Sequence, residues 1–181
     1  MKRTLFALTT AAATLVATVA PAFASSMPKA DFGRANTFGL GVGDGVSLSL
    51  DFPVTGALSL GGAISAQSFR SNTVDLRLLY KLVPGGANRL HVDLLAGLQI
   101  YGPSFGNFSS YDPVIGVALA YPLTNKLTLR GNIAGAFSTT GLGFNATRAS
   151  GIELAYEFTP NLEGTLGGNG RGDVLGLKLS F

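Results

Sequence analysis

Residues 90–100 read Leu-His-Val-Asp-Leu-Leu-Ala-Gly-Leu-Gln-Ile, with an apolar side chain at every second position from Leu90 to Ile100. His91, Asp93 and Gln99 lie between these apolar positions. Successive side chains of a β-strand point to opposite faces, so the pattern predicts a strand with one apolar face. Beyond the first 24 residues, no helix-length window has the i, i+3, i+4, i+7 spacing of an amphipathic helix. The stretch therefore indicates an all-β fold.

The same alternation recurs on both sides of this stretch. It predicts ten strands, near residues 36–42, 46–52, 58–68, 73–82, 89–101, 113–121, 127–137, 148–158, 162–167 and 173–181. Tight turns and longer loops alternate between them, as expected for strands that run up and down in sequence order. The first and ninth stretches alternate least, so eight strands are the alternative to ten. Both numbers are even, so with either of them the two termini lie at the same end of the barrel.

The first 24 residues have the features of a secretory signal peptide. Lys2 and Arg3 precede an apolar stretch over residues 5–20, and Ala22-Phe23-Ala24 is a small-x-small cleavage signal. We predict cleavage after Ala24. Residues 25–36 show no strand pattern and are predicted as a short periplasmic lead-in to a single barrel domain over residues 37–181.

Composition excludes several classes of protein. Apolar residues make up 46% of the chain and charged residues 13%, which is too apolar for intrinsic disorder. The net charge of +3 includes Lys2 and Arg3, which leave with the leader, so no nucleic-acid partner is expected. The chain has no cysteine, which excludes a disulfide framework, a thiolate metal site and a cysteine nucleophile.

The faces opposite the apolar ones favour a membrane barrel. They mix Gly, Ala and Ser with isolated charges, as in the polar interior of a barrel whose outside faces lipid. Aromatic residues gather at strand ends, as Phe52, Tyr80 and Tyr121 do beside the tight turns. We predict an antiparallel up-and-down transmembrane β-barrel. A secreted soluble β-barrel that binds a ligand is the alternative.

The chain ends Val174-Leu-Gly-Leu-Lys-Leu-Ser-Phe181, an alternating stretch that closes on an aromatic residue. With the leader and the strand pattern, this ending resembles the small, eight- to ten-stranded members of the bacterial outer-membrane β-barrel superfamily. The resemblance implies that Leu175, Leu177, Leu179 and Phe181 form a signal for the barrel-assembly machinery. It also implies an outer-membrane location, lipid as the surroundings and periplasmic termini.

Alternation places two groups of charged residues inside the predicted lumen. The first is a charge cluster that we expect to close the tight-turn end: Arg130, Glu153, Glu157, Glu163 and Lys178. The second group comprises Asp75, Arg77, His91 and Asp93. Because His91 is the single histidine, no catalytic triad or multi-histidine zinc site is expected without it.

The predicted role is structural or interactive, with a narrow or closed pore if the lumen conducts, and without enzyme activity, cofactor or metal. An outer-membrane enzyme that modifies envelope lipid is the alternative. The loop over residues 102–112 carries Phe105, Phe108 and Tyr111. These aromatics either belong to the outer girdle or form a surface contact for an unknown extracellular ligand.

Overall fold

The computed structural model describes residues 26–67, 72–86, 88–102, 110–137, 144–146, 150–170 and 172–181. The predicted signal peptide, Phe105 and Phe108 therefore lie outside the described residues. No described helix is long and apolar enough to cross a membrane. The strands are β1 (Thr37–Gly43), β2 (Gly45–Pro53), β3 (Leu58–Gln67), β4 (Asn72–Val83), β5 (His91–Gly102), β6 (Ser110–Pro122), β7 (Leu127–Phe137), β8 (Phe144–Ala146), β9 (Gly151–Thr159), β10 (Leu162–Asn169) and β11 (Asp173–Ser180).

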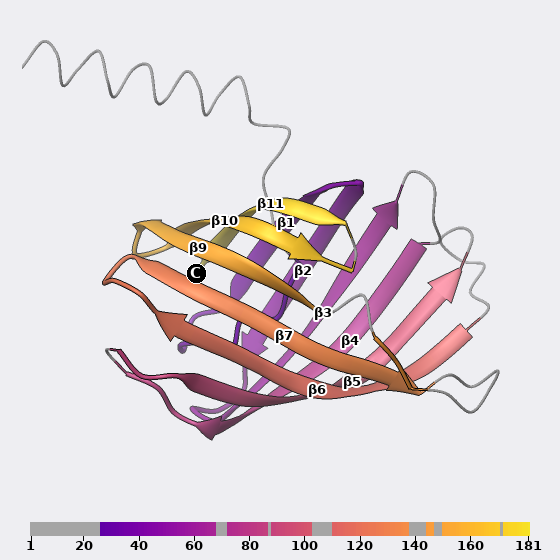
Figure 1. The fold of residues 1–181 in the computed structure, drawn as a ribbon, viewed down its shortest axis with the longest axis horizontal. Helices are drawn as coiled ribbons and strands as arrows, with labels where there is room; N and C mark the ends of the chain where they lie inside the picture. The colour runs from indigo at the N-terminus through magenta and orange to yellow at the C-terminus, as the bar shows by residue number, and fades with distance from the viewer. Residues whose placement is uncertain are drawn as a thin grey trace, which may run out of the picture.

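These strands form a closed antiparallel barrel (Figure 1). Each strand from β1 to β7 pairs with its neighbour in sequence, and β1 closes the ring by pairing with β11. The short β8 pairs with Gly135–Phe137 at one end of β7, whereas β9 pairs with Leu127–Asn132 of the same strand. Strands β8 and β9 thus share one position beside β7. The described barrel has ten positions, which confirms the ten-stranded prediction over the eight-stranded alternative.

Most strand boundaries fall within two residues of their predicted places. The largest differences, of three residues each, are at β6, which begins at Ser110 instead of residue 113, and at β9, which begins at Gly151 instead of residue 148. Tyr111 pairs with Ile100 of β5, so it lies on a strand and not in the loop where we placed it. The polar residues and Pro113 in this stretch hid the continuing alternation, because proline is uncommon within a sheet.

The barrel has an apolar outside and a polar inside. Ile133 is 68% exposed and Ile152 is 58% exposed, and both point outward from the sheet. The inward positions on the same two strands hold buried polar side chains such as Arg130 and Glu153. A water-soluble protein with a single core shows the opposite arrangement. The alternation therefore separates a lipid-like exterior from a charged lumen.

The segment before β1 turns back into the lumen. Asn36 exchanges two backbone hydrogen bonds of 3.0 Å with Phe181, at the tight-turn end of the barrel. From there the chain runs inward, and the backbone N–H of Ser26 donates to Asp173 at the loop end. Met27, Ala30 and Phe32 are buried along this path. We call residues 26–32 the plug.

Because of the plug, the first and last described residues lie at opposite ends of the barrel. Thr37 and Ser180 pair with each other, so the first and last strands end together as the even strand number requires. Ser26, however, lies at the loop end. Alternation locates the start of the first strand, but it does not say where the residues before that strand go.

Candidate functional site

The plug is tied to the lumen wall by a fully buried guanidinium. Arg130 of β7 is 1% exposed, and its Nε and Nη2 donate to the two carboxylate oxygens of Asp31 at 2.7 and 2.9 Å. The same guanidinium binds both oxygens of Glu163 of β10, with Nη2 at 2.7 Å from Oε2. Bidentate pairs of this kind combine strength with fixed geometry. Arg130 therefore holds the plug against two strands.

Further ion pairs extend this cluster. Lys178 Nζ lies 2.8 Å from Glu153 Oε1, and Arg130 Nη1 lies 3.5 Å from the same oxygen. From the plug, Lys29 Nζ lies 3.6 Å from Glu163 Oε2. The structure thus brings together Arg130, Glu153, Glu163 and Lys178, with Lys29 and Asp31 as plug members that sequence reasoning missed.

Glu157 is the fifth residue of the predicted cluster. It lies opposite Glu163 in the register of β9 and β10, as the fold about the turn at Pro160 predicts. Its side chain is half-buried and forms no ion pair among the described residues. Arg130 and Glu163 therefore carry the charged contacts with the plug, and Glu153 and Lys178 pair with each other beside Arg130.

Burial and the neighbouring charges shift the pKa of Asp31 in opposite directions. Burial alone would raise the pKa of this carboxyl, but the Arg130 guanidinium, helped by Lys29, lowers its pKa well below the usual range. A lowered native pKa stabilises the folded state above the unfolded pKa, and this stabilisation is lost progressively as the pH falls from the unfolded pKa through the native pKa. Asp31 therefore stays ionised and paired through the neutral and mildly acidic range.

A second anchor lies toward the loop end. The Ser26 hydroxyl donates to Asp173 Oδ2 at 2.6 Å, and the Ser47 hydroxyl donates to Oδ1 of the same carboxylate at 2.9 Å. The Ser26 carbonyl in turn accepts a hydrogen bond of 2.6 Å from Nη1 of Arg77. These contacts fix the first described residue of the plug to β4 and β11, and Ser47 of β2 holds the same Asp173 carboxylate.

Arg77 pairs with a residue that we did not predict. Its Nε and Nη2 donate to the two oxygens of Asp51 at 2.8 and 2.7 Å, although Asp51 lies on β2, two strands away. The pair passes over Gly61 of β3, where an added Cβ would lie 2.0 Å from Asp51 Oδ1. A glycine between them makes this pairing possible.

The predicted second group does not gather at one point. Arg77 turns to Asp51, and His91 Nδ1 accepts a hydrogen bond of 3.2 Å from the backbone N–H of Gly85 in the neighbouring turn. Asp75 is buried on the inner face of β4. Asp93 is fully buried, and within the described part of the chain neither of its carboxylate oxygens has a hydrogen-bond partner.

Apolar residues complete the lumen wall. Ala30 and Phe32 of the plug belong to one buried cluster with Leu79, Leu95, Val114, Ala118, Ala120, Ala134 and Ala136. These wall residues come from β4 to β7, whereas the acidic residues Glu153 and Glu163 come from β9 and β10. The lumen therefore offers one apolar side and one charged side to the plug.

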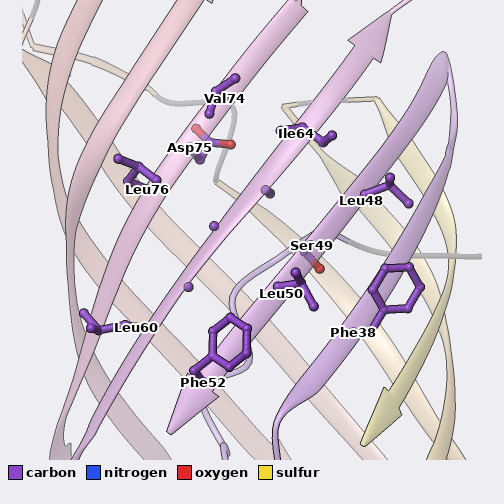
Figure 2. A pocket seen from close by; sticks show the side chains of 13 residues that line it. Phe38, Leu48, Ser49, Leu50, Phe52, Leu60, Ile64, Val74, Asp75 and Leu76 are labelled. Atoms are coloured by element: carbon purple, nitrogen blue, oxygen red, sulfur yellow. The ribbon is translucent and has the colours of Figure 1, made fainter. Parts of the chain in front are cut away.

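The outside of the barrel carries a shallow groove of about 480 Å³. Figure 2 shows Leu50, Phe52 and Leu60 around it, and Gly62 leaves space between the larger side chains of β2 and β4. Its exposed surface is almost entirely apolar, as expected where lipid chains cover a barrel. It lacks the convergent polar groups that orient a small ligand. The lumen is therefore the better candidate site.

The described residues contain no group of three or more His, Cys, Asp or Glu side chains that could hold a metal ion. Four of the lumen carboxylates bind lysine or arginine instead: Asp31, Asp51, Glu153 and Glu163. The arrangement holds a peptide segment in place and fills the cross-section that it occupies.

Comparison with known proteins found no matching family model and no matching curated protein. Among solved structures, the chain is similar to a KdgM porin, with 13% sequence identity and a TM-score of 0.43. The match covers 81% of this chain and 99% of the porin. Over the described residues, the chain forms an antiparallel β-barrel with ten strand positions. Its own strand pairing establishes this architecture, since β6 pairs with β7 and β1 pairs with β11.

Proposed function

We propose that this chain is a small outer-membrane β-barrel whose lumen is closed by its own N-terminal segment, with a structural or interaction role and no enzymatic activity. The observation that carries the proposal is the buried Arg130, which binds Asp31 of the plug and Glu163 of the wall at once. Lys29 and Asp31 of the plug carry opposite charges and pair with Glu163 and Arg130 of the wall, so the plug is complementary to the charged part of the lumen.

The exterior supports a membrane location. Outward-facing Leu76, Ile133 and Ile152 are each more than half exposed, and in water they would form part of a continuous apolar belt. Such belts are rare on soluble monomers and typical of barrels that face lipid. Tyr80, Tyr121 and Tyr156 are exposed near the tight-turn ends of their strands, where an interfacial girdle is expected.

The last strand supports assembly by the barrel-assembly machinery. Its apolar residues alternate with inward-facing Gly176 and Lys178, and Phe181 is 63% exposed at the barrel end. An outward row of apolar residues closing on an aromatic is the pattern that suggested the assembly signal. Leu175, Leu177, Leu179 and Phe181 therefore remain the proposed recognition residues.

Tyr111 favours the girdle interpretation of the loop aromatics. It is exposed near the loop end of β6, where its ring can reach a membrane interface. Phe105 and Phe108 lie outside the described residues, so contact between residues 102–112 and an extracellular ligand stays a prediction.

Membrane fractionation and heat-modifiable gel migration test the proposal together. The mature chain should sediment with outer membranes and migrate faster before boiling than after, because folded barrels resist the detergent. In planar bilayers it should show no large, steady conductance. Recovery of the full chain as a monomer from the soluble periplasm without detergent would overturn the membrane location, and a large steady conductance would overturn the closed lumen.

A further inference from the structure

Lys81 and Asp93 form an unusual pair in the lumen wall. They are direct cross-strand partners on β4 and β5, and both point inward. Opposite charges at such positions normally attract each other, with their Cβ atoms about 5 Å apart. Yet Lys81 Nζ donates to the carbonyl of Phe32 at 2.8 Å and lies 4.1 Å from the centre of the Phe32 ring.

In the docked state the plug therefore binds Lys81, the cross-strand neighbour of the buried Asp93 carboxylate. Asp93 is completely buried, and neither of its oxygens accepts a hydrogen bond from any described residue. A buried carboxyl group without a hydrogen-bond partner destabilises the state in which it occurs. That state is the docked one, because departure of Phe32 would free Lys81 to turn toward Asp93 and would let water reach the carboxylate.

The rest of the lumen wall keeps its charge pairs when the plug is taken away. Arg130 retains Glu163, Lys178 retains Glu153, and Arg77 retains Asp51. The vacated path would be lined by small inward residues, among them Ser47, Gly61, Ala118 and Ala134. The wall therefore supports two states, one with the plug docked and one without it.

We propose that the plug is a displaceable gate, so that the barrel is an ion channel that opens when residues 26–32 leave the lumen, and that Asp93 biases the gate toward opening. This inference rests on the proposed closed membrane barrel. It adds an activity to that barrel, namely gated conduction, and assigns the gate to the chain itself.

The first test weakens the plug without touching the wall. Asp31→Asn removes the charge that Arg130 holds, and breaking a buried ion pair of this kind corresponds to a change of roughly a hundredfold or more in an equilibrium constant. Single-channel recordings in planar bilayers with potassium chloride should show openings about a hundredfold more frequent than in the native chain. Asp44→Asn, the same chemical change at the exposed β1–β2 turn, should leave the native record unchanged.

The second test locks the plug in the Asp31→Asn background. The Ser26 and Ser47 hydroxyls bind the two oxygens of one carboxylate, so we choose these positions for a pair of cysteines, whose joining is checked by the loss of free thiols; the chain contains no other cysteine. Oxidation should abolish the openings and reduction should restore them. The Ser47→Cys variant alone should open equally under both conditions.

The third test concerns Asp93. In the Asp31→Asn background, Asp93→Asn should lower the opening frequency about tenfold or more, because it replaces an ionisable buried group without a hydrogen-bond partner by a neutral one in the docked state. An equal or higher frequency would refute the bias assigned to Asp93.

Heat-modifiable migration of every variant separates failure of the gate from failure of the barrel. An Asp31→Asn chain that folds and inserts but never conducts would overturn the gate while leaving the membrane barrel intact. Openings that persist in the oxidised double-cysteine chain would also overturn it. A chain that neither inserts nor shows heat-modifiable migration would instead refute the proposed function.

Discussion

Replacing Arg130 by methionine tests whether the charge cluster holds the plug. The side chain contacts carboxylates from the plug, β9 and β10, and it is 1% exposed. Removing one partner of a buried ion pair typically costs about 3–5 kcal/mol. Glu153 would keep Lys178 at 2.8 Å and Glu163 would keep Lys29 at 3.6 Å, so Asp31 would lose the most. We expect a loss of about 3–5 kcal/mol in the free energy of unfolding.

Urea titration of the barrel reconstituted in lipid vesicles measures this loss. Arg89→Met is the matched control, because Arg89 is exposed in the turn between β4 and β5, and it should change the free energy by less than about 0.5 kcal/mol. A cost below about 1 kcal/mol for Arg130→Met would show that the cluster contributes little.

A second substitution, Asp31→Asn, should change the free energy of unfolding in opposite directions in two backgrounds. In the native chain, Asp31→Asn removes half of a bidentate pair and should destabilise the barrel. In the Arg130→Met background it removes a carboxylate that has lost its partner, so it should restore about 1–3 kcal/mol. The same sign in both backgrounds would refute the coupling between the plug and β7.

Three further predictions follow from the same contacts. Phe181→Asp should strongly reduce membrane insertion and leave export intact, as measured by fractionation and by processing of the leader; normal barrel yield would contradict the assembly role. Gly61→Ala should cost about 1–3 kcal/mol in the urea titration, because its Cβ would lie 2.0 Å from Asp51 Oδ1 and disturb the pair with Arg77, whereas Gly56→Ala, with nothing near its Cβ, should cost less. The stability difference between the native chain and Asp31→Asn should stay constant from about pH 8 to pH 5 and shrink only below about pH 4, because the pKa of Asp31 is lowered in the folded state; a loss beginning near pH 6 would refute this.

The strands could be predicted because their signal is local. The alternation of apolar and polar side chains shows which side of each strand faces lipid, and the strand register follows once the turns are placed. This information gave the ten positions of the barrel and nearly all strand boundaries. It also placed Arg130, Glu153, Glu163 and Lys178 on inner faces, where proximity follows from strand order.

The partners of the charged residues could not be read in the same way. Arg77 has Asp75 and Asp93 within two strands of it, yet it binds Asp51 across Gly61, which only the curvature of the barrel and the missing Cβ allow. Asp31 binds Arg130, 99 positions along the chain, from a segment that belongs to no strand. Such contacts depend on what fills the lumen, and alternation within strands carries no information about that.

The plug nevertheless left a trace in the sequence. Residues 28–32 read Pro-Lys-Ala-Asp-Phe, in which apolar and charged side chains alternate over too few residues to stand out as a strand. The structure shows why they alternate: Ala30 and Phe32 join the apolar cluster of β4 to β7, whereas Lys29 and Asp31 reach Glu163 and Arg130. The many Gly, Ala and Ser residues on the inner strand faces are the complementary signal, because small side chains around ten strands leave a space that the wall cannot fill. A short two-faced segment beside a barrel with small inner residues therefore predicts an internal plug, and its charged positions indicate which side of the lumen it meets.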